Sequence, residues 1–263
     1  MHVRLSICQI VATLRIRPAV LPALLAGLLL ACTAAPARGA AITWSAAQNI
    51  SGDTDVSTTG TRVGAFHYSP PVSTDVTVNG VVFQGVSVSQ FTTSVTSGNF
   101  TLAGSGAFGL QPGITGSLAA PFSGLSTDYR GLLNTSVAFF QSLTISGLTV
   151  GAQYQFEWWS NDSLRNNSST TVATAVNSVT LIPDTSGTAG GLGQFAIGTF
   201  TADATSQVVA FTPNGALSPN MNAFELRDVT PAVVGAGVPL PAALWPGLIT
   251  SAGLARFALR RWG

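Results

Sequence analysis

The sequence predicts an all-β fold, a single antiparallel β-sandwich with one hydrophobic helix at each end of the chain. Between residues 41 and 230 no apolar residues recur at helical spacing, whereas short alternating apolar and polar runs are frequent. Gly, Pro, Asn or Ser bounds each run, and Asn79-Gly80 between two Val-rich runs is a strong hairpin signal. Many short strands without intervening helices are typical of sandwiches.

The predicted strands follow from these runs in chain order. Residues 97–128 and 183–194 are rich in Gly and Ser with few apolar anchors, so both are predicted to be loops. The predicted strands lie at 42–44, 62–68, 76–78, 81–83, 86–88, 142–146, 154–159, 178–182, 195–200, 207–211 and 223–227.

Residues 1–40 have the order of a secretion signal. A positively charged start precedes an apolar run at 19–31, and small residues at 33–40 suit cleavage by a signal peptidase near Gly39 or Ala40. The run is shorter than the about 20 residues that a membrane-spanning helix needs. An alternative interpretation is a lipobox that ends at Cys32. The positive charges before the apolar run are those of Arg4, Arg15 and Arg17.

The other end of the chain carries a short Pro-containing motif, an apolar stretch predicted as a membrane helix at 242–259, and terminal arginines. This order resembles the sorting tail of PEP-CTERM proteins, in its VPLPA variant, over residues 238–263. The resemblance implies an exosortase that cuts at the motif, a tail held transiently in the inner membrane with its arginines in the cytoplasm, and an exported body. The motif residues are Val238, Pro239, Leu240, Pro241, Ala242, Arg260 and Arg261.

The charges of the body exclude several classes of function. Seven of the eleven basic residues lie in the two ends of the chain. Residues 41–230 therefore contain four arginines and ten acidic residues, and their net charge is −6. No basic surface for nucleic acid is expected. Lys is absent, and both cysteines, Cys8 and Cys32, lie in the signal. We therefore expect no disulfide and no thiol chemistry in the body, and no cofactor.

Two segments resemble carbohydrate-binding modules of the jelly-roll kind. Residues 143–151 lead through a Gly-Leu-Thr turn into 154–159, and 222–227 reads as a closing strand. Alternation places Tyr154, Phe156 and Trp158 on one face, predicted to be core, with Trp159 on the other. The resemblance implies a jelly-roll-like sandwich for the body and a binding role for its loops.

The loop after this strand holds the predicted ligand residues Trp159, Asn161, Asp162 and Arg165. An aromatic face can stack on sugar C–H groups, while amide, carboxylate and guanidinium groups bind hydroxyls. The alternative is that Trp159 only packs, which is the usual role of a buried aromatic residue.

Catalysis and metal binding are the weaker alternatives. Glu157 and Glu225, the two Glu residues of the chain, could form the carboxylate pair of a glycoside hydrolase, but no pattern places them together. His67 reads as a hydrogen-bonded strand residue. Asp53 and Asp55 could contribute to a structural calcium site, although two carboxylates supply few of the six or more oxygens required.

The sequence therefore predicts an exported bacterial surface or matrix protein that is not an enzyme and is associated with extracellular polysaccharide. Its predicted parts are a signal peptide at 1–40, a β-sandwich at 41–230, a linker at 231–237 and the sorting tail at 238–263. A carbohydrate-binding module and, further off, a glycoside hydrolase remain the alternatives.

Overall fold

The computed structural model describes residues 39–68, 74–106, 109–165, 170–215 and 218–232. The predicted signal, the motif at 238–242 and the terminal arginines lie outside these residues. The described residues up to Thr230 belong to one compact unit, and a second unit starts at Pro231. Among the described residues, no helix is both long and apolar enough to cross a membrane.

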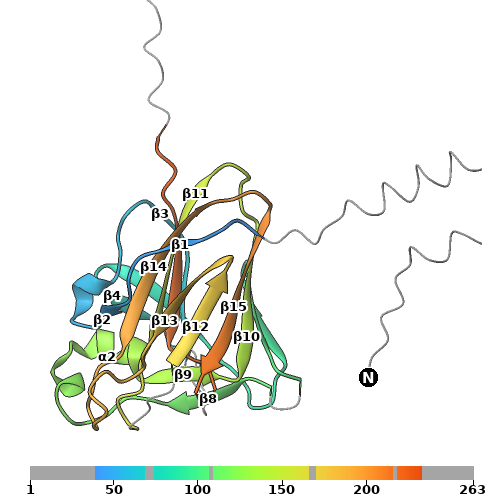
Figure 1. The fold of residues 1–263 in the computed structure, drawn as a ribbon. Coiled ribbons are helices and arrows are strands. Elements are labelled where there is room, and N and C mark those ends of the chain that lie inside the picture. The colour runs from blue at the N-terminus through green and yellow to red at the C-terminus, as the bar shows by residue number, and fades with distance from the viewer. Residues whose placement is uncertain (1–38, 69–73, 107–108, 166–169, 216–217, 233–263) are drawn as a thin grey trace, which may run out of the picture. The chain divides into compact units, whose positions relative to one another are not determined.

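The described chain is mainly β, in agreement with the sequence, and its strands form three sheets (Figure 1). The largest sheet has the order β1-β14-β11-β17-β3-β5-β4, with β2 also paired to β14. All of its pairs are antiparallel except β3 with β5, which run parallel. The strands are β1 (Thr43–Trp44), β2 (Gln48–Asn49), β3 (Thr61–Tyr68), β4 (Val76–Val78), β5 (Val81–Val86), β11 (Gln153–Ser160), β14 (Gln194–Thr201) and β17 (Ala223–Asp228).

The second sheet has the order β13-β12-β15-β10-β7-β6, and a small third sheet has the order β16-β9-β8. The second sheet contains β6 (Ser94–Ser97), β7 (Phe100–Gly104), β10 (Phe140–Ser146), β12 (Thr170–Ala175), β13 (Asn177–Leu181) and β15 (Ser206–Asn214). The third contains β8 (Gln111–Ile114), β9 (Thr135–Ala138) and β16 (Asn220–Met221).

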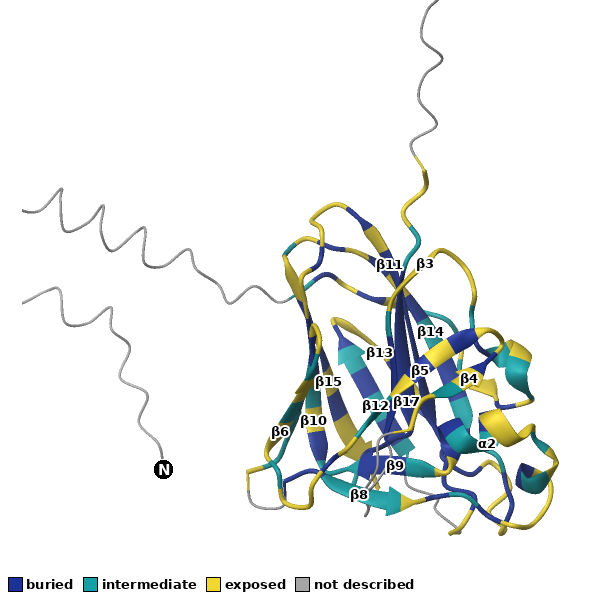
Figure 2. Ribbon diagram, turned by 180° about the vertical axis from the view of Figure 1, so that it is seen from behind, coloured by how far each residue is buried: buried dark blue, intermediate teal, exposed yellow. Residues whose placement is uncertain are grey.

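The two larger sheets face each other across one hydrophobic cluster, and Figure 2 shows buried residues along the strands of both sheets. Trp158 from β11 packs edge-on against Phe211 from β15, with ring centroids 5.2 Å apart. Tyr154, Phe156 and Trp158 are all buried in this cluster, so the predicted core face of the strand is confirmed. The Asn79-Gly80 hairpin is also confirmed, because Val78 pairs with Val81 and both turn residues have positive φ.

The outer face of the largest sheet is covered by a second hydrophobic cluster. Helix α2 (Thr127–Leu133) is capped at its N-terminus by Ser126, whose hydroxyl accepts a hydrogen bond from the Tyr129 amide. The helix buries Tyr129, Leu132 and Leu133. Two short 3₁₀ helices, η3 (Asp53–Asp55) and η4 (Phe122–Gly124), lie in the surrounding loops.

The predicted loop at 97–128 is wrong for several segments within it. It contains β7, β8 and η4, and β6 and α2 overlap its two ends. These strands are short and have few buried residues: β7 buries Phe100 and Leu102, and β8 buries none. Their pairing depends on neighbours distant in sequence, such as β10, rather than on their own apolar pattern. The predicted loop at 183–194 is confirmed up to Gly193, since β14 begins at Gln194.

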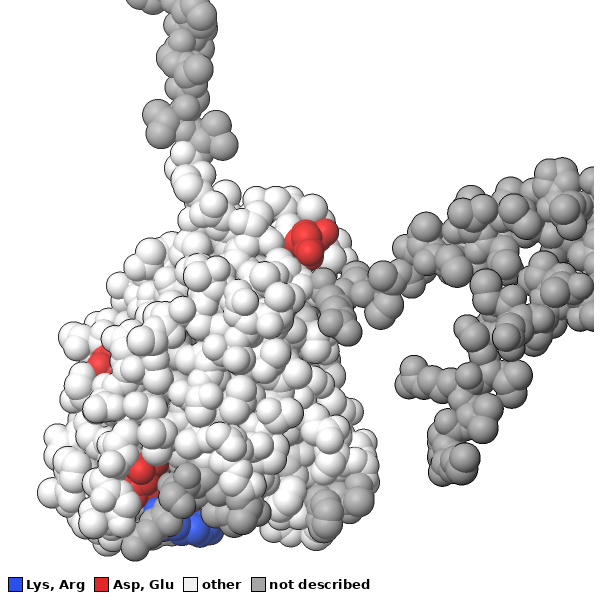
Figure 3. Space-filling view, in the orientation of Figure 1, with Lys and Arg blue, Asp and Glu red and all other residues white. Residues whose placement is uncertain are grey.

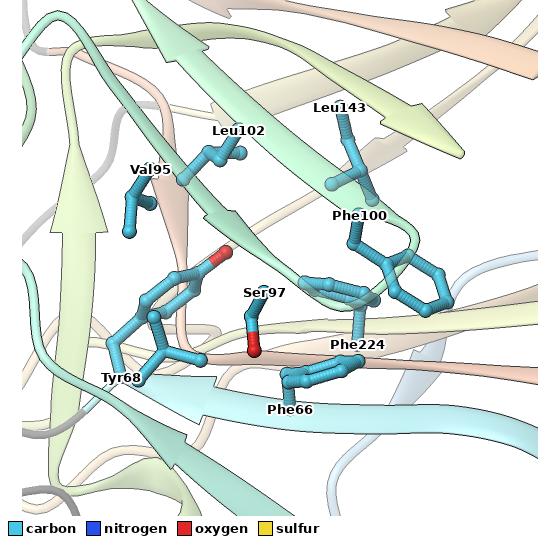
Figure 4. Close-up of a pocket in the computed structure, with 9 residues that line it drawn as sticks. Phe66, Tyr68, Val95, Ser97, Phe100, Leu102, Leu143 and Phe224 are labelled. Carbon is cyan, nitrogen blue, oxygen red and sulfur yellow. The ribbon is translucent and has the colours of Figure 1, made fainter. Parts of the chain in front are cut away.

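The core also contains a cavity of about 10 Å³, lined by aromatic side chains including Phe66, Tyr68 and Phe224 (Figure 4). The Tyr68 hydroxyl is buried without a hydrogen-bond partner among the described residues, and burial raises its pKa. A space of this size is about the minimum for a single water molecule. It is therefore a packing defect beside a polar group and is too small for an organic ligand.

Candidate functional site

The structure separates the four predicted ligand residues into two environments. Trp159 is fully buried in the cluster beneath α2. Its ring stacks on Phe195 with centroids 6.2 Å apart, and its Nε1 donates to the Tyr129 hydroxyl at 3.1 Å. A ring with no exposed face cannot stack on a sugar, so the position of Trp159 fits the packing alternative.

Asn161 is also fully buried and holds the loop in place. Its Oδ1 accepts a hydrogen bond from the Gly193 amide at 2.9 Å, and its backbone N–H donates to Asn222 Oδ1 at 2.6 Å. The Asn222 Nδ2 in turn lies within hydrogen-bond distance of Thr115 Oγ1 and the carbonyls of Leu133 and Thr135. This buried amide network fixes the end of β11 against β17 and α2.

Asp162 and Arg165 line an open hollow of about 330 Å³. Asp162 is buried, and its Oδ1 accepts a hydrogen bond from the Arg165 backbone N–H at 3.3 Å. Its Oδ2 lies 3.6 Å from Arg165 Nη1, while the Arg165 side chain is 63% exposed. The carboxylate thus fixes the backbone of Arg165 and leaves most of the guanidinium facing solvent.

A second hollow of about 590 Å³ adjoins the first, and both are lined by Phe139, Ser218 and Pro219. We call the two together the Phe139 groove. Volumes of this size are typical of small-ligand sites. Its other polar lining residues are Ser105, Gln111, Ser136, Gln141, Thr212 and Asn220.

Phe139 is the groove residue that the sequence did not single out. It lies between β9 and β10 with a φ of 62°, which is rare for a bulky residue, and its carbonyl accepts a hydrogen bond from the Ser105 amide at 3.0 Å. The following Phe140 is fully buried and packs on Phe211. Alternation places consecutive aromatic residues on opposite sides of an extended segment, but Trp158 and Trp159 are both buried in this way, so no sequence signal identifies Phe139 as a surface ring.

Asn220 of β16 contributes a buried polar group to the groove lining. Its backbone N–H donates to Thr171 Oγ1 at 2.9 Å and its Nδ2 donates to Ser136 Oγ at 3.3 Å. Its Oδ1 has no hydrogen-bond partner among the described residues. Buried amide oxygens are nearly always paired, so this atom is an unsatisfied acceptor within the wall of the groove.

The groove lies at the opposite end of the body from the points where the chain enters and leaves it. Ala41, Gln153 and Val229 line one common hollow, and the Val229 amide donates to the Gln153 carbonyl at 2.8 Å. From Gln153, β11 extends about 24 Å to Ser160, just before the groove residues. Figure 1 shows β8 and β9 at the groove end of the body, which is the lower end in that view. Figure 3 shows a face with little charge, whose visible basic atoms also lie at the lower end.

A second polar centre joins the two Glu residues that sequence alone could not place together. Glu157 of β11 and Glu225 of β17 are direct cross-strand partners, and both are buried, at 1% and 0% exposure. Burial raises the pKa of both carboxyls, and the charge of Glu225 raises that of Glu157 further. A hydrolytic pair must reach a substrate, and these buried carboxyls do not.

Arg227 compensates the charge of Glu225. Its Nη1 donates to Glu225 Oε1, while its Nε and Nη2 donate to the carbonyls of Thr58, Thr59 and Gly60. The Ser57 amide donates to Glu157 Oε2 at 3.1 Å. The guanidinium and the carboxyl pair therefore attach the loop at 57–60 to the outer face of the sheet.

The carboxylates of the predicted calcium loop bind neighbouring protein donors. Asp53 Oδ1 accepts from Ser126 Oγ, and Asp55 Oδ2 accepts from the Tyr129 hydroxyl at 2.9 Å and from the Ser51 and Gly52 amides. Within the described part of the chain, no three His, Cys, Asp or Glu side chains are grouped to hold a metal ion. His67 fits its predicted role in a strand, with Nε2 2.7 Å from the Thr74 carbonyl.

Comparison with known proteins gives one distant structural likeness. No protein-family model and no curated protein sequence matches the chain. A calcium-binding mutant of Bacteroides uniformis beta-glucuronidase 2 is similar in structure over 62% of this chain and 19% of that chain, with 13% identity and a TM-score of 0.40. The chain thus corresponds to less than a fifth of that protein, and a likeness at this level carries no argument about activity.

Proposed function

We propose that this protein is an exported bacterial surface or matrix protein whose jelly-roll-like β-sandwich body binds extracellular polysaccharide in the Phe139 groove without hydrolysing it. The observation that carries the proposal is the composition of the groove. It combines a half-buried aromatic ring, amide and hydroxyl groups, and an exposed guanidinium in adjoining hollows. Rings that cover sugar C–H faces and polar groups that bind hydroxyls are what such a ligand requires.

The position of the groove supports the same function. The groove lies about 24 Å along β11 from the strand end beside Val229, so the described residues at which the chain leaves the body do not cover it. The burial of Glu157 and Glu225 favours binding over hydrolysis, since the described residues that line the groove include no exposed carboxylate pair.

The test is a glycan-binding screen with residues 39–232, which contain both hydrophobic clusters. The variant is Phe139→Ala and the matched control is Phe91→Ala. Phe91 has nearly the same φ, 63°, is 68% exposed and does not line the groove.

We expect the intact body to retain a polysaccharide in affinity electrophoresis, Phe139→Ala to weaken retention about tenfold, and Phe91→Ala to leave it unchanged. Equal weakening by both variants, or no retained glycan at all, contradicts the proposal. Release of reducing sugar by the intact body, lost in Glu157→Gln, would support a hydrolase instead.

The sorting proposal for residues 238–263 has its own test, since these residues lie outside the described structure. We propose that an exosortase cuts at Val238–Ala242 and that Arg260 and Arg261 hold the tail at the cytoplasmic side until then. In a host that contains such an enzyme, the chain with both arginines changed to Ala should accumulate uncut. Equal processing of both chains contradicts this proposal.

A further inference from the structure

We propose that the Phe139 groove selects acidic polysaccharides, with a uronic acid carboxylate paired to Arg165. This inference depends on the proposed binding function and specifies the class of ligand. Arg165 and Phe139 line the same hollow of about 330 Å³, so one sugar unit can contact both.

The local electrostatics of Arg165 favour a carboxylate. Its guanidinium is 63% exposed, and the Asp162 carboxylate lies 3.6 Å away, beyond ordinary hydrogen-bond distance. Because most of the guanidinium faces solvent and forms no close hydrogen bond to Asp162, it can turn to a ligand without breaking one. A guanidinium offers two parallel N–H donors that match a carboxylate.

Asp162 acts as a positioning residue for this arginine. It is buried, and it accepts the Arg165 backbone N–H, which fixes where the side chain leaves the loop. Among the described arginines, Arg165 lines the groove and the others do not. By contrast, Arg227 is buried and is bonded to Glu225 and the loop at 57–60.

Phe139 and the polar lining define the rest of the ligand. The ring can cover an apolar C–H face, and the hydroxyl and amide groups of the groove can bind sugar hydroxyls. Together with Arg165, they require a ligand that carries hydroxyls, a carboxylate and an apolar C–H face. Uronic acids in a polymer have this combination, whereas neutral glucans lack the carboxylate.

The net charge of the body, −6, opposes a polyanion at long range. Salt limits this repulsion to a Debye length of about 8 Å at physiological ionic strength, while the contact with Arg165 is direct. The selectivity therefore comes from the direct contact between Arg165 and the ligand carboxylate, not from the net charge of the body.

The test measures binding of residues 39–232 to alginate, polygalacturonate and hyaluronan, and to the same polymers after methyl esterification of their carboxyls. Esterification removes the charge and keeps the backbone and its hydroxyls. The variants are Arg165→Gln and Arg165→Lys, and the control is Arg130→Gln, on α2 outside the groove.

We expect at least one polyuronate to bind and its ester to bind about tenfold or more weakly, as for the loss of a charge-assisted hydrogen bond. Arg165→Gln should weaken binding of the acid by the same factor as esterification does. Arg165→Lys should weaken it less, and Arg130→Gln should leave it unchanged. Equal binding of acid and ester, or binding of neutral glycans alone, overturns this inference and leaves the proposed function intact. Failure of every glycan to bind overturns both.

Discussion

The buried carboxyl pair makes the stability of the body depend on pH, and Glu157→Gln should remove much of that dependence. Glu157 Oε2 accepts a hydrogen bond from the Ser57 amide, while its Oε1 and Glu225 Oε2 are buried without partners among the described residues. We expect Glu157 to be protonated and to donate to Glu225. Gln at this position keeps the acceptor for Ser57 and supplies an N–H donor that does not titrate.

The direction of the change in stability with pH follows from the raised pKa of Glu157. Burial makes the folded protein hold a proton that the unfolded chain releases above about pH 4.3. The stabilisation is therefore fully present below that pH and is lost as the pH rises through the folded pKa. Within this window, one extra proton on the folded state corresponds to a loss of about 1.4 kcal/mol of unfolding free energy for each pH unit.

The assay is urea unfolding followed by tryptophan fluorescence at about pH 5, 6, 7 and 8. The unfolding free energy of the unsubstituted body should fall more steeply with pH than that of Glu157→Gln, with a difference of up to about 1.4 kcal/mol per pH unit while Glu157 stays protonated. The control is Asp203→Asn, an exposed residue in the turn between β14 and β15, which should keep the full dependence. Parallel pH profiles for the body and Glu157→Gln would show that Glu157 is not protonated in the folded state.

Three further substitutions test other parts of the account by urea unfolding. Arg227→Ala leaves the buried Glu225 uncompensated and removes three carbonyl contacts, so we expect a loss of about 3–5 kcal/mol; a loss below 1 kcal/mol refutes the compensation. Asn222→Ala removes the amide that joins Asn161 to the carbonyls of Leu133 and Thr135, with an expected loss of about 3 kcal/mol, and unchanged stability contradicts the network. Trp159→Ala empties a fully buried site and should cost about 3–5 kcal/mol, whereas an unchanged midpoint means that the ring is exposed.

The strongly patterned parts of the fold could be predicted from sequence. Alternation in β11 identified Tyr154, Phe156 and Trp158 as core, and Asn79-Gly80 identified a hairpin, because both signals act within a few residues. Strands β7 and β8 and helix α2 were missed because they are short. The seven residues of α2 are too few to show helical periodicity, and their burial depends on contact with β4 and β3.

The candidate site could be predicted only in part, for the same physical reason. Asp162 and Arg165 reach the groove because they follow the end of a strand, which a sequence can indicate. Whether Trp159 is exposed depends on α2 and on Phe83 and Phe195, which cover the outer face of the sheet. Likewise, the pairing of Glu157 with Glu225 is a register between strands almost seventy residues apart, which local patterns do not encode.

The most direct test of the central claim is to map a bound oligosaccharide on the body by NMR, from the amide shifts of residues 39–232 during titration with a short polyuronate. We predict that the shifted amides cluster at the Phe139 groove, around Phe139, Arg165 and Asn220, and that amides near Gln153 and Val229 at the opposite end stay unchanged. Shifts centred on another surface, or no shifts with any glycan that the screen contains, would contradict the assignment of the groove as the binding site.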